Sequence, residues 1–186
     1  SQYKHATGTP LAERVRADNV ATSVIMLAQG IPFIHAGTEL LRSKSMDRNS
    51  YDSGDWYNEI DWTRATSKWN QGLPRAADNS GNFDQIKNVV LDVTAVQDQA
   101  AREASLANFK DLLTIRKSSP LFRLRTKSQV DQRVKFYNTG PFQYPGLIAM
   151  GIDGCAEPDF KPAEGALMLV FNGSDDARTL NLFGNE

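Results

Sequence analysis

The chain has 186 residues, and its 21 Lys and Arg against 22 Asp and Glu give a formal net charge of −1. This length fits one domain, or one domain with a small appendage. With 40% hydrophobic and 23% charged residues, the composition is that of an ordinary globular protein and excludes disorder, collagen and a coiled coil. We expect no nucleic-acid partner, because neutralising phosphates requires a clear basic excess.

The only cysteine, Cys155, cannot form an internal disulfide, so the fold must depend on its core. The two histidines, His5 and His35, stand far apart and do not have the spacing of metal ligands. The longest uncharged stretch, 19–38, is interrupted by polar residues and predicts a helix, a turn and a strand; we expect no membrane helix. The chain starts at Ser1, with neither an initiator Met nor an apolar signal region. We therefore expect it to be a piece of a longer protein.

The first predicted element is a helix over 11–29. Thr9 and Pro10 form a good start signal, apolar residues recur at helical spacing, and Gly30 supplies a left-handed stop. A short apolar run follows at once and predicts a strand over 31–35, buried on both faces as in a parallel sheet covered by helices. Helix, glycine and buried strand together indicate an α/β segment.

Residues 37–82 differ in kind, because they are polar and show neither helical nor strand periodicity. Loops of this length in compact domains are usually functional or carry short irregular elements. A second helix is predicted over 98–116, ending before the Ser118–Pro120 stretch, which we take as the domain boundary.

After Pro120 the hydrophobic pattern becomes alternating. Short alternating runs separated by turn residues indicate an antiparallel sheet. The predicted strands are 121–125, 133–137, 147–152, 166–171 and 178–182. The fold class expected for the chain is therefore α+β.

All three tryptophans lie between residues 56 and 69, interleaved with tyrosines and carboxylates. Aromatic faces beside acids, amides and arginines suit sugars, whose C–H faces stack on rings while their hydroxyls need paired donors and acceptors. The alternative is that these rings only pack beneath a long loop. The clustering favours at least one functional ring.

A calcium site is a second interpretation of this region, because Asp47, Asn49 and Tyr51 place oxygen atoms at alternate positions. The pattern then departs from an EF-hand, since Asp52 stands where the turn glycine belongs and Asn58 where the bidentate glutamate belongs. An EF-hand is excluded, and a looser oxygen-ligand site remains open. We expect no cofactor, and calcium does not follow from the sequence.

Several stretches together resemble one family closely. They are 29–37 (QGIPFIHAG), 41–45 (LRSKS), 50–58 (SYDSGDWYN), 72–74 (GLP), 116–124 (RKSSPLFRL) and 133–141 (RVKFYNTGP). These stretches resemble pullulanases and plant-type limit dextrinases, which are debranching members of the α-amylase superfamily. The similarity extends from about residue 11 to 182.

The resemblance implies that 1–118 is the end of a catalytic (β/α)8 barrel, with helix 11–29 as its seventh helix and 31–35 as its eighth strand. Residues 119–186 would begin a C-terminal antiparallel β-sandwich. Barrel active sites lie at the carboxyl ends of the strands, so the loop 37–82 would rim the substrate cleft. The implied substrates are α-1,6 branch points in pullulan, starch and limit dextrins.

The family retains anomeric configuration with an aspartate nucleophile, a glutamate acid/base and a supporting aspartate. These belong to motifs on the fourth, fifth and seventh strands, which would precede Ser1. We therefore assign no catalytic residue here, neither His5 nor the pair Asp52 and Asp55, and expect the isolated chain to be inactive.

The family places a substrate-binding acid directly after the arginine of its Ser-Lys-Ser-x-x-Arg-Asp run. The matching positions are Arg48 and Asn49, and Asn49 departs from the family by losing the charge. The candidates for substrate contact are Arg48, Asn49, Tyr51 and Trp56. The residues expected to be structural ion-pair members are Arg42, Lys44 and Asp52.

The expected partners are a branched α-glucan and the remainder of the catalytic barrel, with no membrane. The alternative function is a non-catalytic accessory module that stabilises the enzyme or binds carbohydrate. The resemblance favours an extracellular or bacterial cell-surface location, and a plastid also stays open.

Overall fold

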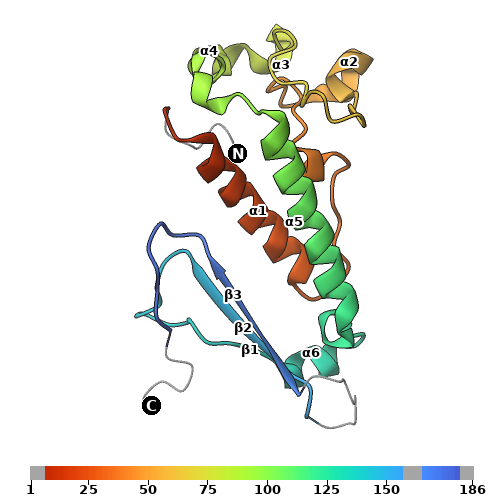
Figure 1. The fold of residues 1–186 in the computed structure, drawn as a ribbon, viewed down its shortest axis with the longest axis vertical. Coiled ribbons are helices and arrows are strands. Elements are labelled where there is room, and N and C mark those ends of the chain that lie inside the picture. Colours follow the sequence, from red (N-terminus) through yellow and green to blue (C-terminus); the bar gives the residue numbers. More distant parts are fainter. Residues whose placement is uncertain (1–6, 157–164, 181–186) are drawn as a thin grey trace. The chain divides into compact units, whose positions relative to one another are not determined.

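The computed structural model describes residues 7–156 and 165–180, and these form an α+β structure with one three-stranded antiparallel sheet (Figure 1). The chain divides into two compact units. Unit 1 comprises residues 1–19 and 34–110, and unit 2 comprises residues 20–33 and 111–186.

Helices make up most of the regular structure. The α-helices are α1 (Leu11–Leu27), α2 (Asp55–Asn58), α3 (Ala76–Asn79), α4 (Phe83–Leu91), α5 (Gln99–Ser118) and α6 (Lys127–Arg133). The 3-10 helices are η2 (Thr38–Leu40), η3 (Ser50–Asp52), η4 (Ser80–Asn82), η5 (Val93–Ala95) and η6 (Pro120–Arg123). The strands are β1 (Val134–Phe136), β2 (Leu147–Asp153) and β3 (Ala166–Asn172). None of the helices in the described ranges is both long and apolar enough to cross a membrane.

In unit 1, a buried ion pair fixes the first turns of α1. The Nη2 atom of Arg14 lies 2.7 Å from Oδ2 of Asp92, and the two side chains are 5% and 6% exposed. Asp92 is also the N-cap of η5, where its carboxylate accepts hydrogen bonds from the backbone N–H and the hydroxyl of Thr94. One carboxylate therefore joins two segments that are distant in the sequence.

In unit 2, Arg116 closes the C-terminal end of α1. Its guanidinium donates to the carbonyl oxygens of Met26 at 2.7 Å, Ala28 at 2.9 Å and Gly30. The last carbonyls of a helix lack partners within the helix, and a cation there also matches the helix dipole. The position of Arg116 in the RKSSP stretch thus has a structural reason.

The sheet of unit 2 has the order β1-β2-β3 (Figure 1). Register pairs Met150 with Leu169 and Ile152 with Leu167 across β2 and β3. Met150, Ile152 and Leu169 are buried, at 4%, 1% and 7% exposure, and form the packed face of the sheet. The predicted strands 147–152 and 166–171 are confirmed. The helices predicted over 11–29 and 98–116 are confirmed as α1 and α5, with shifted ends.

Two of the predicted strands are not strands in this structure. Residues 31–35 have no strand hydrogen bonds, and Ile31 and Phe33 are 96% and 93% exposed. A strand exists only through its neighbours, and no described segment pairs with this one. Residues 121–125 were expected as a strand, but Pro120–Arg123 form η6, with the Ser119 hydroxyl accepting from the N–H of Leu121.

The predicted strand 133–137 is shorter than expected, because α6 precedes it and β1 covers only Val134–Phe136. The start of α6 is set by Thr126, whose hydroxyl accepts from the N–H of Gln129. Of the predicted strand 178–182, residues 178–180 are not strand, and the rest lies outside the described residues.

Candidate functional site

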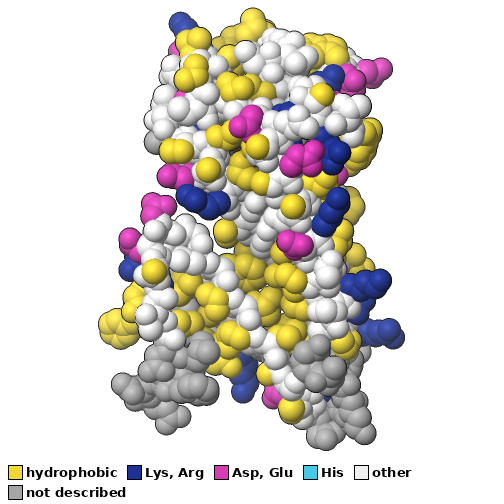
Figure 2. All heavy atoms as spheres, in the orientation of Figure 1, with side chains coloured by type: hydrophobic (Ala, Val, Ile, Leu, Met, Phe, Trp, Pro, Cys, Tyr) yellow, Lys and Arg dark blue, Asp and Glu magenta, His cyan; other side chains and the backbone are white. Residues whose placement is uncertain are grey.

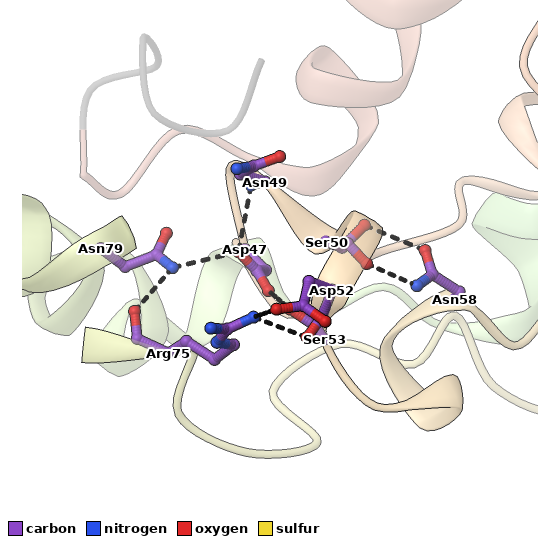
Figure 3. Close-up of polar contacts among 8 residues, drawn as sticks. All are labelled: Asp47, Asn49, Ser50, Asp52, Ser53, Asn58, Arg75 and Asn79. Carbon is purple, nitrogen blue, oxygen red and sulfur yellow. Dashed lines mark hydrogen bonds and ion pairs between the residues drawn. The ribbon is translucent and has the colours of Figure 1, made fainter. Parts of the chain in front are cut away.

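The polar loop 37–82 is organised around one buried carboxylate, that of Asp47, which is 7% exposed. It accepts hydrogen bonds from the N–H of Asn49 at 3.1 Å, from Nδ2 of Asn79 at 3.0 Å and from the hydroxyl of Ser53 (Figure 3). Burial alone would raise the pKa of Asp47, but these hydrogen bonds outweigh it and hold the pKa below its usual value. Asp47 is therefore charged at neutral pH, and both of its carboxylate oxygens accept hydrogen bonds from the loop itself.

Asn79, at the end of α3, is the partner that ties this carboxylate to a distant part of the loop. Its side chain is 1% exposed, and its Nδ2 also donates to the carbonyl of Arg75 at 2.9 Å. Its Oδ1 accepts from the N–H of Arg48 at 3.1 Å. Both donor hydrogens and the oxygen of this buried amide are thus engaged by groups of the loop.

Asp52 serves the loop as well, through an ion pair with Arg75. Nη1 of Arg75 lies 3.0 Å from Oδ2 of Asp52 and 2.6 Å from the Asp52 carbonyl oxygen (Figure 3). This supports the expected structural role of Asp52. The pair is exposed, so its contribution to stability is small.

Hydrogen bonds to Ser50 and Asn58 order the next turn. The hydroxyl of Ser50 donates to Oδ1 of Asn58 at 2.9 Å, and Nδ2 of Asn58 returns a bond to the Ser50 carbonyl at 2.8 Å. Lys44 donates to the Ser50 hydroxyl at 2.8 Å, and Arg42 donates to the carbonyls of Ala36 and Asn58. Arg42 and Lys44 form no ion pair with a described carboxylate, so they hold the loop through hydrogen bonds instead.

Three of the four predicted substrate residues lie on the outside of this network. Arg48 and Asn49 are exposed, and their side chains form no hydrogen bond or ion pair with any described residue. The Tyr51 ring is 87% exposed. The loop therefore fixes the backbone at these positions and leaves the side chains available.

Trp56, the fourth predicted substrate residue, has one part of its ring packed against the backbone at Gly72. A Cβ atom added at Gly72 would lie 2.6 Å from the ring atom Cη2 of Trp56, so only glycine fits there. On the neighbouring position, Tyr57 is buried and donates its hydroxyl to the carbonyl of Leu73. The Trp56 residue remains 43% exposed, so part of its ring is available to a ligand.

On the face drawn in Figure 2, acidic and basic side chains lie interspersed, with no field of one sign. Exposed rings beside exposed amide and guanidinium groups suit a neutral hydroxyl-rich ligand better than a polyanion.

Within the ranges 7–156 and 165–180, no group of three or more His, Cys, Asp and Glu side chains could hold an ion. Of the three residues in the calcium interpretation, Asp47 accepts hydrogen bonds through its carboxylate oxygens, while Asn49 and Tyr51 are exposed. The sequence interpretation named Asp47 only as a possible oxygen ligand and missed its structural role in the loop. Its signal is an Asx turn, in which the carboxylate binds the N–H two residues on.

The chain matches the family model of alpha-1,6-glucosidases, pullulanase-type, C-terminal, over residues 64–185. A pullulanase of Klebsiella pneumoniae is 40% identical over 186 residues, covering 99% of this chain and 17% of the relative. The chloroplastic pullulanase 1 of Arabidopsis thaliana is 49% identical over 141 residues, covering 76% of this chain and 15% of the relative.

Solved structures agree with these sequence matches. The crystal structure of PulA from Klebsiella oxytoca matches with a TM-score of 0.89 at 40% identity, over 98% of this chain and 17% of that one. A maltotriose complex of PulA from Klebsiella pneumoniae matches with a TM-score of 0.88 at 38% identity, over 96% of this chain and 19% of that one.

The chain belongs to the pullulanase-type α-1,6-glucosidase family, of which it carries the C-terminal region. It spans about one sixth of the length of the curated relatives that it matches.

Proposed function

We propose that this chain acts as the C-terminal part of a glycoside hydrolase that cleaves α-1,6-glucosidic branch points in pullulan, starch or limit dextrins. The observation that carries the proposal is the 40% identity to a Klebsiella pneumoniae pullulanase over 99% of the chain, which includes the whole loop 37–82. The maltotriose complex of a pullulanase from the same species supports an α-glucan as the ligand.

Within such an enzyme, residues 1–118 would end the catalytic (β/α)8 barrel and residues 119–186 would begin a β-sandwich. The exposure of Ile31 and Phe33 supports this assignment, because an apolar run of this kind is stable in water only when another segment covers it. The remainder of the barrel is then the partner of residues 31–35.

The contribution of the loop 37–82 is substrate contact. Arg48 and Asn49 would donate and accept hydrogen bonds to sugar hydroxyls, and Tyr51 and Trp56 would stack on sugar rings. Their exposure, beside carboxylates and amides that are already engaged within the loop, supports this role. Stacking of this kind needs an accessible ring face, which the exposed Tyr51 provides.

A second candidate function is a non-catalytic accessory module that binds carbohydrate or stabilises the enzyme. The engagement of Asp47 and Asp52 within the loop favours it, since neither is available as an acid or a nucleophile. The two functions differ in whether the loop residues affect turnover or binding alone.

The experiment combines hydrolysis and binding. The purified chain is incubated with pullulan, and no release of maltotriose is expected; release would show that the chain is itself catalytic. Branched dextrin is then titrated into the chain and into Asn49→Ala and Trp56→Ala. Weaker binding by both variants supports the loop as a sugar site, and unchanged affinity shows that the loop is structural.

The proposed enzyme would belong to a bacterium or a plastid, which is supported by relatives that include bacterial pullulanases and a chloroplastic one.

A further inference from the structure

Two successive backbone N–H groups of the loop end on the same buried pair of side chains. The N–H of Arg48 donates to Oδ1 of Asn79 at 3.1 Å, and the N–H of Asn49 donates to Oδ1 of Asp47 at 3.1 Å. The two acceptors are joined to each other, because Nδ2 of Asn79 donates to Oδ1 of Asp47 at 3.0 Å (Figure 3).

The pair is built to be rigid. Asp47 and Asn79 are 7% and 1% exposed. Asp47 is held further by the Ser53 hydroxyl, and Asn79 by the Arg75 carbonyl. A buried carboxylate and a buried amide with all these bonds made are costly to disturb, because any lost bond leaves a polar group unpaired away from water.

The side chains of Arg48 and Asn49, whose backbone N–H groups are held, are themselves unengaged among the described residues, in contrast to those of Asp47 and Asn79. Arg48 and Asn49 are exposed and form no side-chain hydrogen bond with a described residue. A fixed backbone under unengaged polar side chains lowers the entropy that a ligand must remove on binding. Such an arrangement has no benefit for stability at the side chains themselves.

We propose that Asp47 and Asn79 are positioning residues, which hold Arg48 and Asn49 in the orientation that binds the α-glucan. This inference rests on the proposed function, since the ligand is that of the proposed sugar site. The pair does not touch the sugar; it acts through the two N–H groups.

The test uses the chain itself and measures two quantities separately: how firmly the two backbone N–H groups are held, and how tightly dextrin binds. The first variant is Asn79→Ala, and the matched control is Asn88→Ala, an exposed asparagine of α4 that forms no hydrogen bond with a described residue. Amide hydrogen exchange at Arg48 and Asn49 is followed by NMR, and the affinity for branched dextrin by calorimetry. Unfolding in urea establishes the fraction of each variant that is folded.

We expect Asn79→Ala to exchange the Arg48 amide at least tenfold faster and to bind dextrin at least fivefold more weakly, with Asn88→Ala unchanged in both. Unchanged exchange overturns the proposal, and so does faster exchange with unchanged affinity. If the unsubstituted chain binds no dextrin, the proposed sugar site fails, and this inference fails with it.

A second variant covers the case in which Asn79→Ala does not fold. Asp47→Asn keeps the volume of the side chain and an oxygen that can accept from the Asn49 N–H, but removes the charge. We expect faster exchange at Asn49 and weaker dextrin binding in this variant. Wild-type values for both would overturn the proposal.

Discussion

The ring of Trp56 occupies the space that a side chain at position 72 would need, since a Cβ built on Gly72 would lie 2.6 Å from Cη2 of the ring. Trp56 is also close to Gly54, where an added Cβ would lie 2.9 Å from the indole Cδ1 and Nε1. Two glycines thus allow the loop backbone to approach one aromatic ring that stays partly exposed.

Gly72→Ala is therefore expected to displace the Trp56 ring. Overpacking of this kind costs about 1–3 kcal/mol of unfolding free energy, and the displaced ring should change the tryptophan fluorescence. Gly81→Ala is the matched control, because nothing lies within 4 Å of a Cβ at that glycine. Urea unfolding of both variants measures the difference, and equal stabilities would contradict the contact.

Arg116→Met should destabilise unit 2, because it leaves the carbonyls of Met26, Ala28 and Gly30 without their donor. A charged donor serving three carbonyls, with the bond to Met26 buried, predicts a loss of about 2–4 kcal/mol. Arg116→Lys keeps the charge but lacks the planar fork, so an intermediate loss is expected. The control is Lys117→Met at the next, exposed position of α5. A control loss as large as that of Arg116→Met would refute the explanation.

The free energy of unfolding should depend on pH through the ionisation of Asp47. Its surroundings hold its pKa below the usual 3.8, so the carboxylate contributes stability above that pH and loses it as the pH falls through the folded-state pKa. The charged and titratable groups that act on it electrostatically are Lys44, Tyr57 and Arg75. These two cations keep their charge throughout the acid range, and Tyr57 stays neutral there.

The comparison is between the wild-type chain and Asp47→Asn, unfolded in urea at a series of pH values from about 7 down to about 2.5. Wild type should be the more stable above about pH 4, and the difference should shrink as the pH falls further. A difference that is independent of pH would show that the Asp47 charge contributes nothing.

The buried phenol of Tyr57 gives a further prediction. Its hydroxyl donates to the carbonyl of Leu73, and burial raises the pKa of the phenol. Tyr57→Phe should lose about 1 kcal/mol of unfolding free energy. Tyr51→Phe, at an exposed ring, should lose none. Thermal or urea unfolding distinguishes the two, and equal effects would argue against the hydrogen bond.

How far the sequence predicts the fold depends on how local the determining interactions are. The helices α1 and α5 follow from apolar spacing and end signals, and β2 and β3 follow from alternation between turns, so all four were predictable. Residues 31–35 were not, because a strand requires hydrogen bonds from other strands, and hydrophobicity alone does not supply them. For Pro120–Arg123, the apolar pattern indicates a strand, whereas Ser119 and Pro120 form a helix start in the structure.

The sequence indicates where a candidate site lies, but it does not indicate the hydrogen bonds that hold that loop together. The aromatic and polar composition of 37–82 indicates a binding loop, and the exposure of Tyr51 agrees with that. The hydrogen bond between Asp47 and Asn79 joins residues that are 32 positions apart, and no local sequence pattern predicts such a contact. The alternation at Asp47 and Asn49 suggested a metal, whereas a carboxylate can equally bind a nearby N–H.

The central claim is that the exposed side chains of the loop contact an α-glucan during debranching. It is tested most directly in a chimeric Klebsiella pneumoniae pullulanase whose corresponding segment is replaced by this chain. The measured quantity is kcat/KM for pullulan. The Asn49→Ala, Tyr51→Ala double variant should lower it about tenfold or more, as expected for the loss of a hydrogen bond and a stacked ring. Asn88→Ala should leave it unchanged. A double variant within twofold of the unsubstituted chimera would contradict the claim.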